Sequence, residues 1–197
     1  GAPYFEAKGE AAFYGPKIDV QIKKINGQEE TDFTGQYDFV MPKRFELKYI
    51  DTDGKENEPI VIHRSSIGCF ERTMAFLIEH YAGAFPVWLA PVQAVIIPVS
   101  EKVSGYAKEV MAEMQKAASG AGNQLRLELD SRNEPLSAKI RSAQLKKVPY
   151  MVIVGEKERD ARLVSLRLRS GQNAGTLTIA EMAEKIREKE TSRSLDL

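Results

Sequence analysis

The segment GAFPVWLAP, residues 83–91, separates two parts of the chain that have different hydrophobic patterns. Its glycine and two prolines end any helix that precedes them, because proline lacks the backbone N–H that a helix needs. Before this segment, extended runs follow one another through short turns. After it, buried extended runs alternate with amphipathic helical runs. We therefore predict two domains, over residues 1–90 and 91–197.

Residues 1–90 are predicted to contain an antiparallel sheet. In KIDVQIK, residues 17–23, apolar and polar side chains alternate strictly, which is typical of a half-buried strand. The Asn26-Gly27 pair favours a tight hairpin, because both turn positions adopt positive φ. FELKYI, the turn DTDG and EPIVIHR predict a second extended pair. Apolar residues recur at helical spacing from Ile67 onward and predict a helix.

Residues 91–197 are predicted to form a smaller α/β domain. VQAVIIPV, LRLEL, VPYMVIVG and RLVSLRLR are predicted strands, and residues 101–118 and 136–147 are predicted helices. A last helix is expected to begin at Thr178, because Glu181 completes a capping box. Strands alternating with helices imply crossover connections and a mixed sheet. The fold class predicted for the chain is α/β, or α+β overall, with an antiparallel-sheet fragment before the α/β domain.

The composition is that of a soluble globular protein, with 43% hydrophobic and 28% charged residues. The sequence shows no signal-peptide pattern and no apolar run long enough to span a bilayer. A single cysteine excludes an intrachain disulfide, so we expect a cytoplasmic protein with no membrane partner. The formal net charge of zero conceals two unlike halves. Residues 1–90 hold 10 Lys and Arg against 14 Asp and Glu, whereas residues 91–197 hold 18 against 14.

The residues alone do not complete a metal site or a familiar catalytic motif. His63, His80 and Cys69 are the only nitrogen or sulfur side chains of the usual zinc-binding types. A tetrahedral zinc site needs three or four protein ligands, so these residues favour a hydrogen-bonded histidine at the end of a strand. The sequence also contains no nucleophile elbow, P-loop or dinucleotide fingerprint.

Two groups of basic residues point to anion binding, although solvated surface charges remain the alternative for both. Arg72 follows IGC in the first turn of a predicted helix, where free N–H groups favour a phosphate and Gly68 would let a ligand approach the backbone. In the second half, Arg167 and Arg169 are expected on one strand face. Basic residues also crowd one helix and its approach: Arg132, Lys139, Arg141, Lys146 and Lys147. Such surfaces bind phosphates and single-stranded RNA.

These features occur in an order that resembles the threonyl-tRNA synthetases, a family of class II aminoacyl-tRNA ligases. GEAAFYGPKID and TGQYDF…MPKRFELKYI resemble segments of the catalytic core, and VIHRSSIGCFER resembles the third class II signature motif. FPVWLAPVQ resembles the junction to the anticodon-binding domain. DSRNEPLSAKIR, KKVPYMVIVGEKE and SLRLRSG resemble that domain. The resemblance covers essentially the whole chain.

The resemblance implies a role for each matching residue. Arg72 would be the catalytic arginine that binds ATP, and His63 would be one zinc ligand whose partner ligands lie upstream of this chain. We expect both to border one adenylate cavity. The ATP and threonine site would also include Tyr14, Thr34, Gln36 and Cys69. The anticodon-binding residues would be Asn133, Arg141, Lys147, Glu158 and Arg167.

The implied cofactors are Zn²⁺ and Mg²⁺ with ATP, and the implied partners are threonine, tRNA(Thr) and a second subunit of a homodimer. Glu30-Thr31 stands where many relatives carry Trp-Gln, Cys69 where serine is common, and Lys147 where arginine is frequent. The first two class II motifs are absent from these residues, so we expect the isolated chain to be inactive. The alternative function is a non-catalytic tRNA-binding module built from the same two domains.

Overall fold

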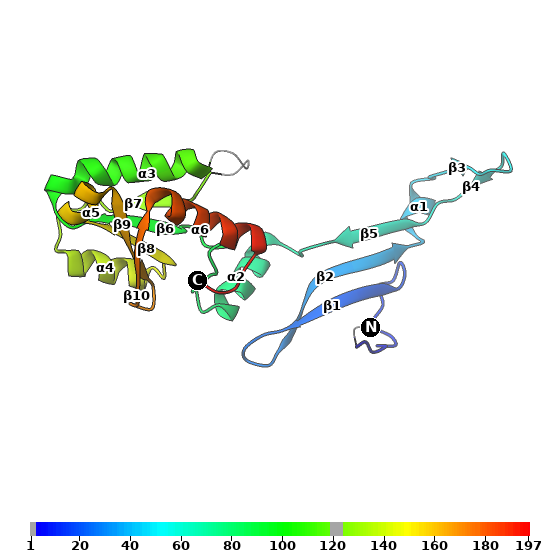
Figure 1. Ribbon diagram of the computed structural model, residues 1–197. Helices are drawn as coiled ribbons and strands as arrows, with labels where there is room; N and C mark the ends of the chain where they lie inside the picture. The colour runs from blue at the N-terminus through cyan, green and yellow to red at the C-terminus, as the bar shows by residue number, and fades with distance from the viewer. Residues whose placement is uncertain (1–2, 119–123) are drawn as a thin grey trace. The chain divides into compact units, whose positions relative to one another are not determined.

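The computed structural model describes residues 3–118 and 124–197, which form two compact units (Figure 1). The first unit ends at His80 and the second begins at Tyr81. Residues between Tyr81 and Ala90 pack into the second unit, where the side chain of Val87 is fully buried. Among the described helices, none combines the length and the apolar character needed to cross a bilayer.

The first unit is built on an antiparallel sheet with the strand order β1-β2-β5 (Figure 1). Its strands are β1 (Lys17–Lys23), β2 (Glu29–Asp38) and β5 (Val61–Ser65). The hairpin predicted at Asn26-Gly27 joins β1 to β2, which confirms that prediction. The pairing slips by one residue opposite Val20 and Gln21, so Asp32 is left unpaired as a β-bulge.

The second extended pair of this unit differs from the prediction. Its strands β3 (Tyr49–Ile50) and β4 (Glu56–Asn57) are short, and they pair only with each other. The VIHR segment belongs instead to β5, which pairs with β2. Pro59 lies between β4 and β5, and because it has no N–H to donate it interrupts a continuous strand. A four-residue helix, α1 (Met41–Arg44), connects β2 to β3 and was not predicted.

The expected half-buried face of β1 is mostly uncovered, which corrects the prediction. Ile18 is 71% exposed, and Ile62 of β5 on the same sheet face is 60% exposed. Helix α2 (Phe70–His80) forms at the predicted place, yet none of its residues is buried. The reason is that α2 contacts only the end of the sheet that contains Ile22 and leaves the rest of this face open. The apolar core clusters of the described residues all lie in the second unit.

The second unit contains the predicted mixed sheet, with the strand order β10-β9-β8-β6-β7. The parallel strands are β6 (Ala94–Pro98), β7 (Leu127–Leu129) and β8 (Tyr150–Val154). The antiparallel strands are β9 (Leu163–Leu168) and β10 (Asn173–Thr178). We did not predict β10, because five of its six residues are exposed and carry no apolar alternation.

Helices cover both faces of this sheet (Figure 1). They are η1 (Glu101–Val103), α3 (Ser104–Ala118), α4 (Leu136–Leu145), α5 (Glu156–Ala161) and α6 (Ile179–Ser192). The larger core lies between one sheet face and the pair α3 and α6, and the smaller core lies between the other face and α4. The predicted capping box begins α6: Thr178 Oγ1 accepts a bond from the Glu181 N–H at 3.2 Å.

Tyr150 gives a first test of the packing of the second unit. Its side chain is fully buried in the larger core, and its hydroxyl has no hydrogen-bond partner in the described part of the chain. Tyr150→Phe is therefore expected to raise the free energy of unfolding by about 1 kcal/mol, because it removes an unsatisfied buried polar group. Urea unfolding measures this change.

The same residue predicts a loss of stability at alkaline pH. Burial raises the pKa of Tyr150 from 10.0 to about 12. Above pH 10 the unfolded state can release the tyrosine proton while the folded state retains it, so stability should fall between pH 10 and about 12. Tyr150→Phe should make this part of the decline smaller. An unchanged alkaline profile in the variant would contradict the assignment.

Candidate functional site

One candidate cluster lies on the polar face of the first sheet. Gln36 of β2 is paired directly with His63 of β5, so the two side chains project from the same face. The Tyr14 hydroxyl donates to Gln36 Oε1 at 2.7 Å, and the Tyr14 ring lies edge-on to His63 with 6.2 Å between the ring centroids. Three residues that the sequence predicted for the site are thus in one cluster.

Asp38 holds His63 in this cluster. The carboxylate is only 1% exposed, and its Oδ2 lies 2.8 Å from His63 Nε2. Its Oδ1 accepts the backbone N–H groups of Val40 and Met41, both at 2.9 Å. Burial alone would raise the pKa of Asp38, but the bonds from Met41, His63 and Val40 together lower it. The carboxylate therefore stays charged and orients the imidazole.

Thr34 lies on the same polar face but is bonded to its neighbours. Its hydroxyl donates to Asp19 Oδ1 at 2.6 Å, and Asp19 is also paired with Lys17. Asp19 is the cross-strand partner of Thr34, so their contact follows from the β1–β2 register. Burial alone would raise the pKa of Asp19, but the bonds from Lys17 and Thr34 lower it. The Thr34 side chain is thereby fixed in one orientation.

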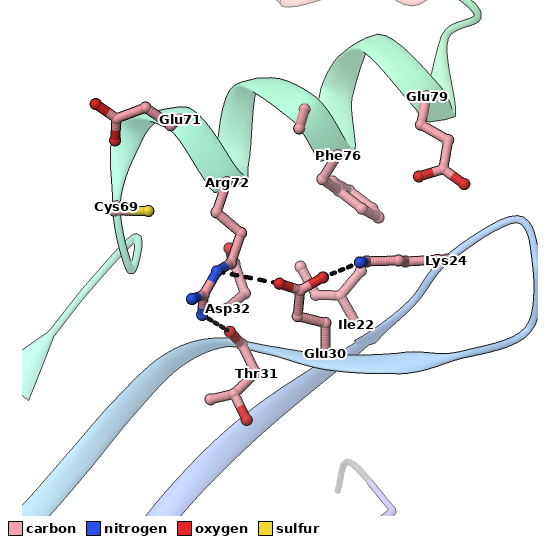
Figure 2. Close-up of a pocket in the computed structure, with 11 residues that line it drawn as sticks. Ile22, Lys24, Glu30, Thr31, Asp32, Cys69, Glu71, Arg72, Phe76 and Glu79 are labelled. Carbon is pink, nitrogen blue, oxygen red and sulfur yellow. Dashed lines mark hydrogen bonds and ion pairs between the residues drawn. The ribbon is translucent and has the colours of Figure 1, made fainter.

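Arg72 lines a different part of the unit, a pocket of about 410 Å³ between α2 and the β1–β2 hairpin (Figure 2). Its Nε forms an ion pair with Glu30 Oε1 at 3.1 Å, and its Nη1 donates to the Thr31 carbonyl at 3.1 Å. Lys24 forms a second ion pair with Glu30. Cys69, another predicted site residue, is exposed and lines the same pocket.

The structure does not place His63 and Arg72 beside one cavity, contrary to our expectation. Arg72 contacts Glu30 and Thr31 at the start of β2, whereas His63 contacts Asp38 at its end. Asp38 lies seven residues after Thr31, which corresponds to about 23 Å of strand. The extended backbone of β2 therefore keeps the two clusters apart, and the described residues alone do not form a shared adenylate cavity.

Gly68 also has a different role from the one expected. Its φ is +63°, and a Cβ at this position would lie 2.5 Å from the backbone oxygen of Asp32. The space that the missing side chain leaves is thus occupied by the bulge of β2, not by room for a ligand. Glycine is required here because a side chain would collide with the backbone and because the left-handed region is costly for other residues.

The predicted anticodon residues lie around α4 in the second unit. Arg167 of β9 is paired with Met151, which packs in the α4-side core, so Arg167 projects from this sheet face. Its Nε is buried and has no hydrogen-bond partner among the described residues. A buried arginine donor without a partner is unusual, because leaving it unsatisfied costs free energy.

Glu158 is part of the local structure near Arg167. Its Oε2 accepts the Gly155 N–H at 2.9 Å and completes the capping box of α5, while its Oε1 accepts the Ser165 hydroxyl at 2.9 Å. Ser165 and Arg167 are alternate residues of β9 and share a face. Burial alone would raise the pKa of Glu158, but hydrogen bonds, the first from Ser165, lower it.

The other three predicted anticodon residues lie on α4 or directly beside it in the chain. Asn133 is exposed in the loop before α4, and Arg141 is exposed on the helix itself. Lys147 follows α4 in the left-handed conformation, and its ammonium group donates to the Ala82 carbonyl. The structure therefore places three of the five residues on α4 or its flanks, Glu158 on α5 and Arg167 on β9, without closing them into one pocket.

Sequence reasoning missed three contacts at these sites. The contact of Asp38 with His63 could have been predicted, because Asp38 lies on the same alternating strand face as Thr34 and Gln36. The Lys24–Glu30 pair was also accessible, since a hairpin centred on Asn26-Gly27 brings these positions together. Neither charge periodicity nor spacing indicated that the same glutamate would contact Arg72, which lies on a helix 42 residues later in the chain.

Comparisons with known proteins match both units. Residues 5–81 match the tRNA synthetase class II core domain (G, H, P, S and T), and residues 93–189 match the anticodon binding domain. The chain is 47% identical over 183 residues to a threonine–tRNA ligase of Clostridium perfringens and 49% identical over 186 residues to threonine–tRNA ligase 1 of Bacillus subtilis. These alignments cover 93% and 94% of this chain but only 28% of each relative.

A solved structure agrees with these matches. It is the RNA binding domain of threonyl-tRNA synthetase from Cryptosporidium parvum Iowa II. The two chains superpose with a TM-score of 0.78 and are 34% identical, over 91% of this chain and 44% of the other. The two units therefore carry a catalytic-core segment and an anticodon-binding fold in the order that the sequence predicted.

Proposed function

Because this chain belongs to the threonyl-tRNA synthetase family, we propose that it supplies one side of an ATP and threonine site together with the anticodon reader of a threonine–tRNA ligase. We assign the catalytic part to residues 1–90 and the anticodon-binding domain to residues 91–197. The proposed setting is the cytoplasm, and the proposed assembly of the whole enzyme is a homodimer.

The proposed reaction has two steps. The carboxylate of threonine attacks the α-phosphorus of ATP, which forms threonyl-adenylate and releases pyrophosphate with Mg²⁺. The terminal ribose hydroxyl of tRNA(Thr) then takes the threonyl group, and AMP leaves. Arg72 neutralises phosphate charge during the first step, and Cys69 lies in the same pocket as Arg72. Tyr14, Thr34 and Gln36 line the threonine and adenylate site from the polar face of the first sheet.

The observation that best supports catalysis is the connected polar network Tyr14–Gln36 and Asp38–His63 on one sheet face. The alternative function is a non-catalytic tRNA-binding module. Such a module does not require a buried carboxylate, Asp38, that orients the partly exposed His63. Such a network costs stability unless each member is satisfied, so its presence favours a functional site.

His63 also fits one corner of a zinc site. A carboxylate bonded to one ring nitrogen of a histidine orients the other nitrogen toward a metal, and Asp38 occupies that supporting position. Within residues 3–118 and 124–197, no group of three metal-binding side chains occurs, so His63 would share the metal with ligands outside the described residues. Bound zinc would supply a Lewis-acid centre that recognises the threonine hydroxyl. Asp38 would hold His63 in place.

The isolated chain gives the first test of this division of roles. We expect no ATP–pyrophosphate exchange with threonine from these residues alone, because the first two class II motifs are not among them. The measurement is radioactive pyrophosphate exchange at saturating threonine and MgATP. Turnover by the isolated chain would show that the site is complete without those motifs.

Arg167 provides a test of the anticodon reader. Arg167→Ala is expected to weaken binding of tRNA(Thr) by roughly 1–3 kcal/mol, because the guanidinium, whose Nε has no partner among the described residues, would no longer contact a base. Filter binding with anticodon-mutated tRNA should show lost discrimination. Arg187→Ala is a matched control, since Arg187 donates to the Ala117 carbonyl between α6 and α3. A changed salt dependence with intact discrimination would instead identify a phosphate contact.

A further inference from the structure

The side chain of Glu30 forms an ion pair with Arg72, the arginine that binds the ATP phosphates in the proposed function. Its Oε1 lies 3.1 Å from Arg72 Nε, and Figure 2 shows the carboxylate between Arg72 and Lys24. A carboxylate and a phosphate present similar oxygens to a guanidinium, and both favour a fork of two parallel N–H groups. Glu30 and a phosphate therefore compete for the same donors.

The two edges of the Arg72 guanidinium are not equally available. The Thr31 carbonyl accepts from Nη1 at 3.1 Å and belongs to the backbone of β2, so it moves only with the strand. Glu30 lies at the Nε edge and is a partly exposed side chain, which can rotate away. A phosphate that approaches Arg72 therefore gains its fork most easily where Glu30 now lies.

Lys24 gives Glu30 a second partner that does not depend on Arg72. The ammonium of Lys24 pairs with the other carboxylate oxygen, Oε2. The bond from Lys24 is the largest cause that lowers the pKa of Glu30, with burial acting against it and Arg72 adding a smaller effect. The carboxylate is thus charged at neutral pH, and it keeps a cation when it leaves Arg72.

The charges around the pocket strengthen the competition between Glu30 and a phosphate for Arg72. The pocket is lined by four carboxylates, Glu30, Asp32, Glu71 and Glu79, against two cations, Lys24 and Arg72. Acidic side chains therefore outnumber basic ones by two, and the guanidinium is partly neutralised before any ligand binds. Such surroundings disfavour a polyanion unless a carboxylate is displaced.

We infer that Glu30 is an internal competitor for Arg72, so that a nucleotide triphosphate must displace this carboxylate before the arginine can bind its phosphates. The inference rests on the proposed function, in which Arg72 binds ATP. Glu30 is a specificity-determining residue in this arrangement: it lowers the affinity for a weakly charged or single phosphate more than for a triphosphate, which has more oxygens to exchange for the carboxylate.

The experiment is isothermal titration of MgATP into the full-length protein and its variants. Glu30→Gln keeps the size of the side chain and one acceptor oxygen but removes its charge, and we expect it to tighten MgATP binding about five-fold, which corresponds to about 1 kcal/mol. Inorganic phosphate, used as a second probe, should gain more than MgATP does. Glu30→Ala repeats the test with a different side chain if the first variant folds poorly.

Glu79→Gln is the matched control. Glu79 lines the same pocket and forms no ion pair with Arg72, so its neutralisation changes the overall charge equally. We expect less than a two-fold effect from it. An equal gain in both variants would show a general field effect and overturn the inference. Weaker binding in Glu30→Gln would also overturn it, because Glu30 would then orient Arg72 instead of competing with phosphate.

A double-mutant cycle separates this inference from the proposed function. In the background of Arg72→Ala, Glu30→Gln should no longer change the affinity for MgATP, because the two side chains then have nothing to compete for. If Arg72→Ala alone leaves MgATP binding unchanged, the proposed role of Arg72 fails. If Arg72→Ala abolishes binding while Glu30→Gln has no effect, only the inference of competition fails.

Discussion

Replacing Arg72 by alanine in the full-length protein is expected to lower kcat/KM for threonine activation by about a hundred-fold to a thousand-fold. The guanidinium is the proposed source of charge neutralisation on the ATP phosphates, and removing one such donor from an active site typically costs this much. The structure places Arg72 in the first turns of α2 with its side chain directed to the sheet (Figure 2). Pyrophosphate exchange as a function of MgATP concentration measures the effect.

The control for this prediction is Arg64→Ala. Arg64 is exposed on β5 and is paired with Gly35, so it projects from the sheet face opposite to His63. We expect the kcat/KM of the Arg64→Ala variant to stay within two-fold of the value of the parent enzyme. Arg72→Lys should recover only part of the lost kcat/KM, because an ammonium keeps the charge but cannot form a bidentate contact with phosphate. Activity of Arg72→Ala above a third of the parent value would remove Arg72 from the catalytic assignment.

The second large effect is expected at Arg126, which connects three parts of the second unit. Its Nε donates to the Ala90 carbonyl at 2.9 Å and its Nη2 donates to the Trp88 carbonyl at 2.9 Å. Its Nη1 contacts Glu190 of α6 at 3.1 Å. Arg126→Ala is expected to lower the free energy of unfolding by about 2–4 kcal/mol, since partly buried carbonyls and a carboxylate lose their donor.

Calorimetry of the full chain tests this prediction, with an expected fall of roughly 10 °C in the melting temperature of the second unit. Arg132→Ala is the matched control. Arg132 also forms two ion pairs, with Asp130 and Glu134, but its side chain is exposed and these partners are carboxylates, not backbone carbonyls of the core. Its loss should cost less than about 1 kcal/mol. Equal destabilisation by the two variants would contradict the structural role of Arg126.

Much of the second unit followed from local sequence patterns. The apolar runs around Ile96 and Val152 are the central parallel strands, and Thr178 with Glu181 caps the last helix as predicted. These features depend on residues close together in the chain, where periodicity and hydrogen-bonding chemistry act directly. β10 was missed because its exposed residues carry no such signal.

The first unit was harder to predict, because its strands are stabilised by pairing across long separations. The hairpin at Asn26-Gly27 was evident, whereas the pairing of β5 with β2 was not. The alternation around Ile18 identified a strand but gave a wrong expectation of burial, since burial depends on what covers the face. Gly68 was identified as special, but its neighbour is the Asp32 backbone and not a ligand.

The sequence by itself determined the family, the order of the two units and the residue types available for chemistry at His63 and Arg72. Periodicity and ordered segments encode these properties, and they need no knowledge of distant contacts. Only the tertiary structure decided which charges meet. It joined His63 to Asp38 and Arg72 to Glu30, and it separated the two clusters along β2. The physical reason is that the electrostatic partner of a side chain depends on strand register and helix position, which are set by the whole fold.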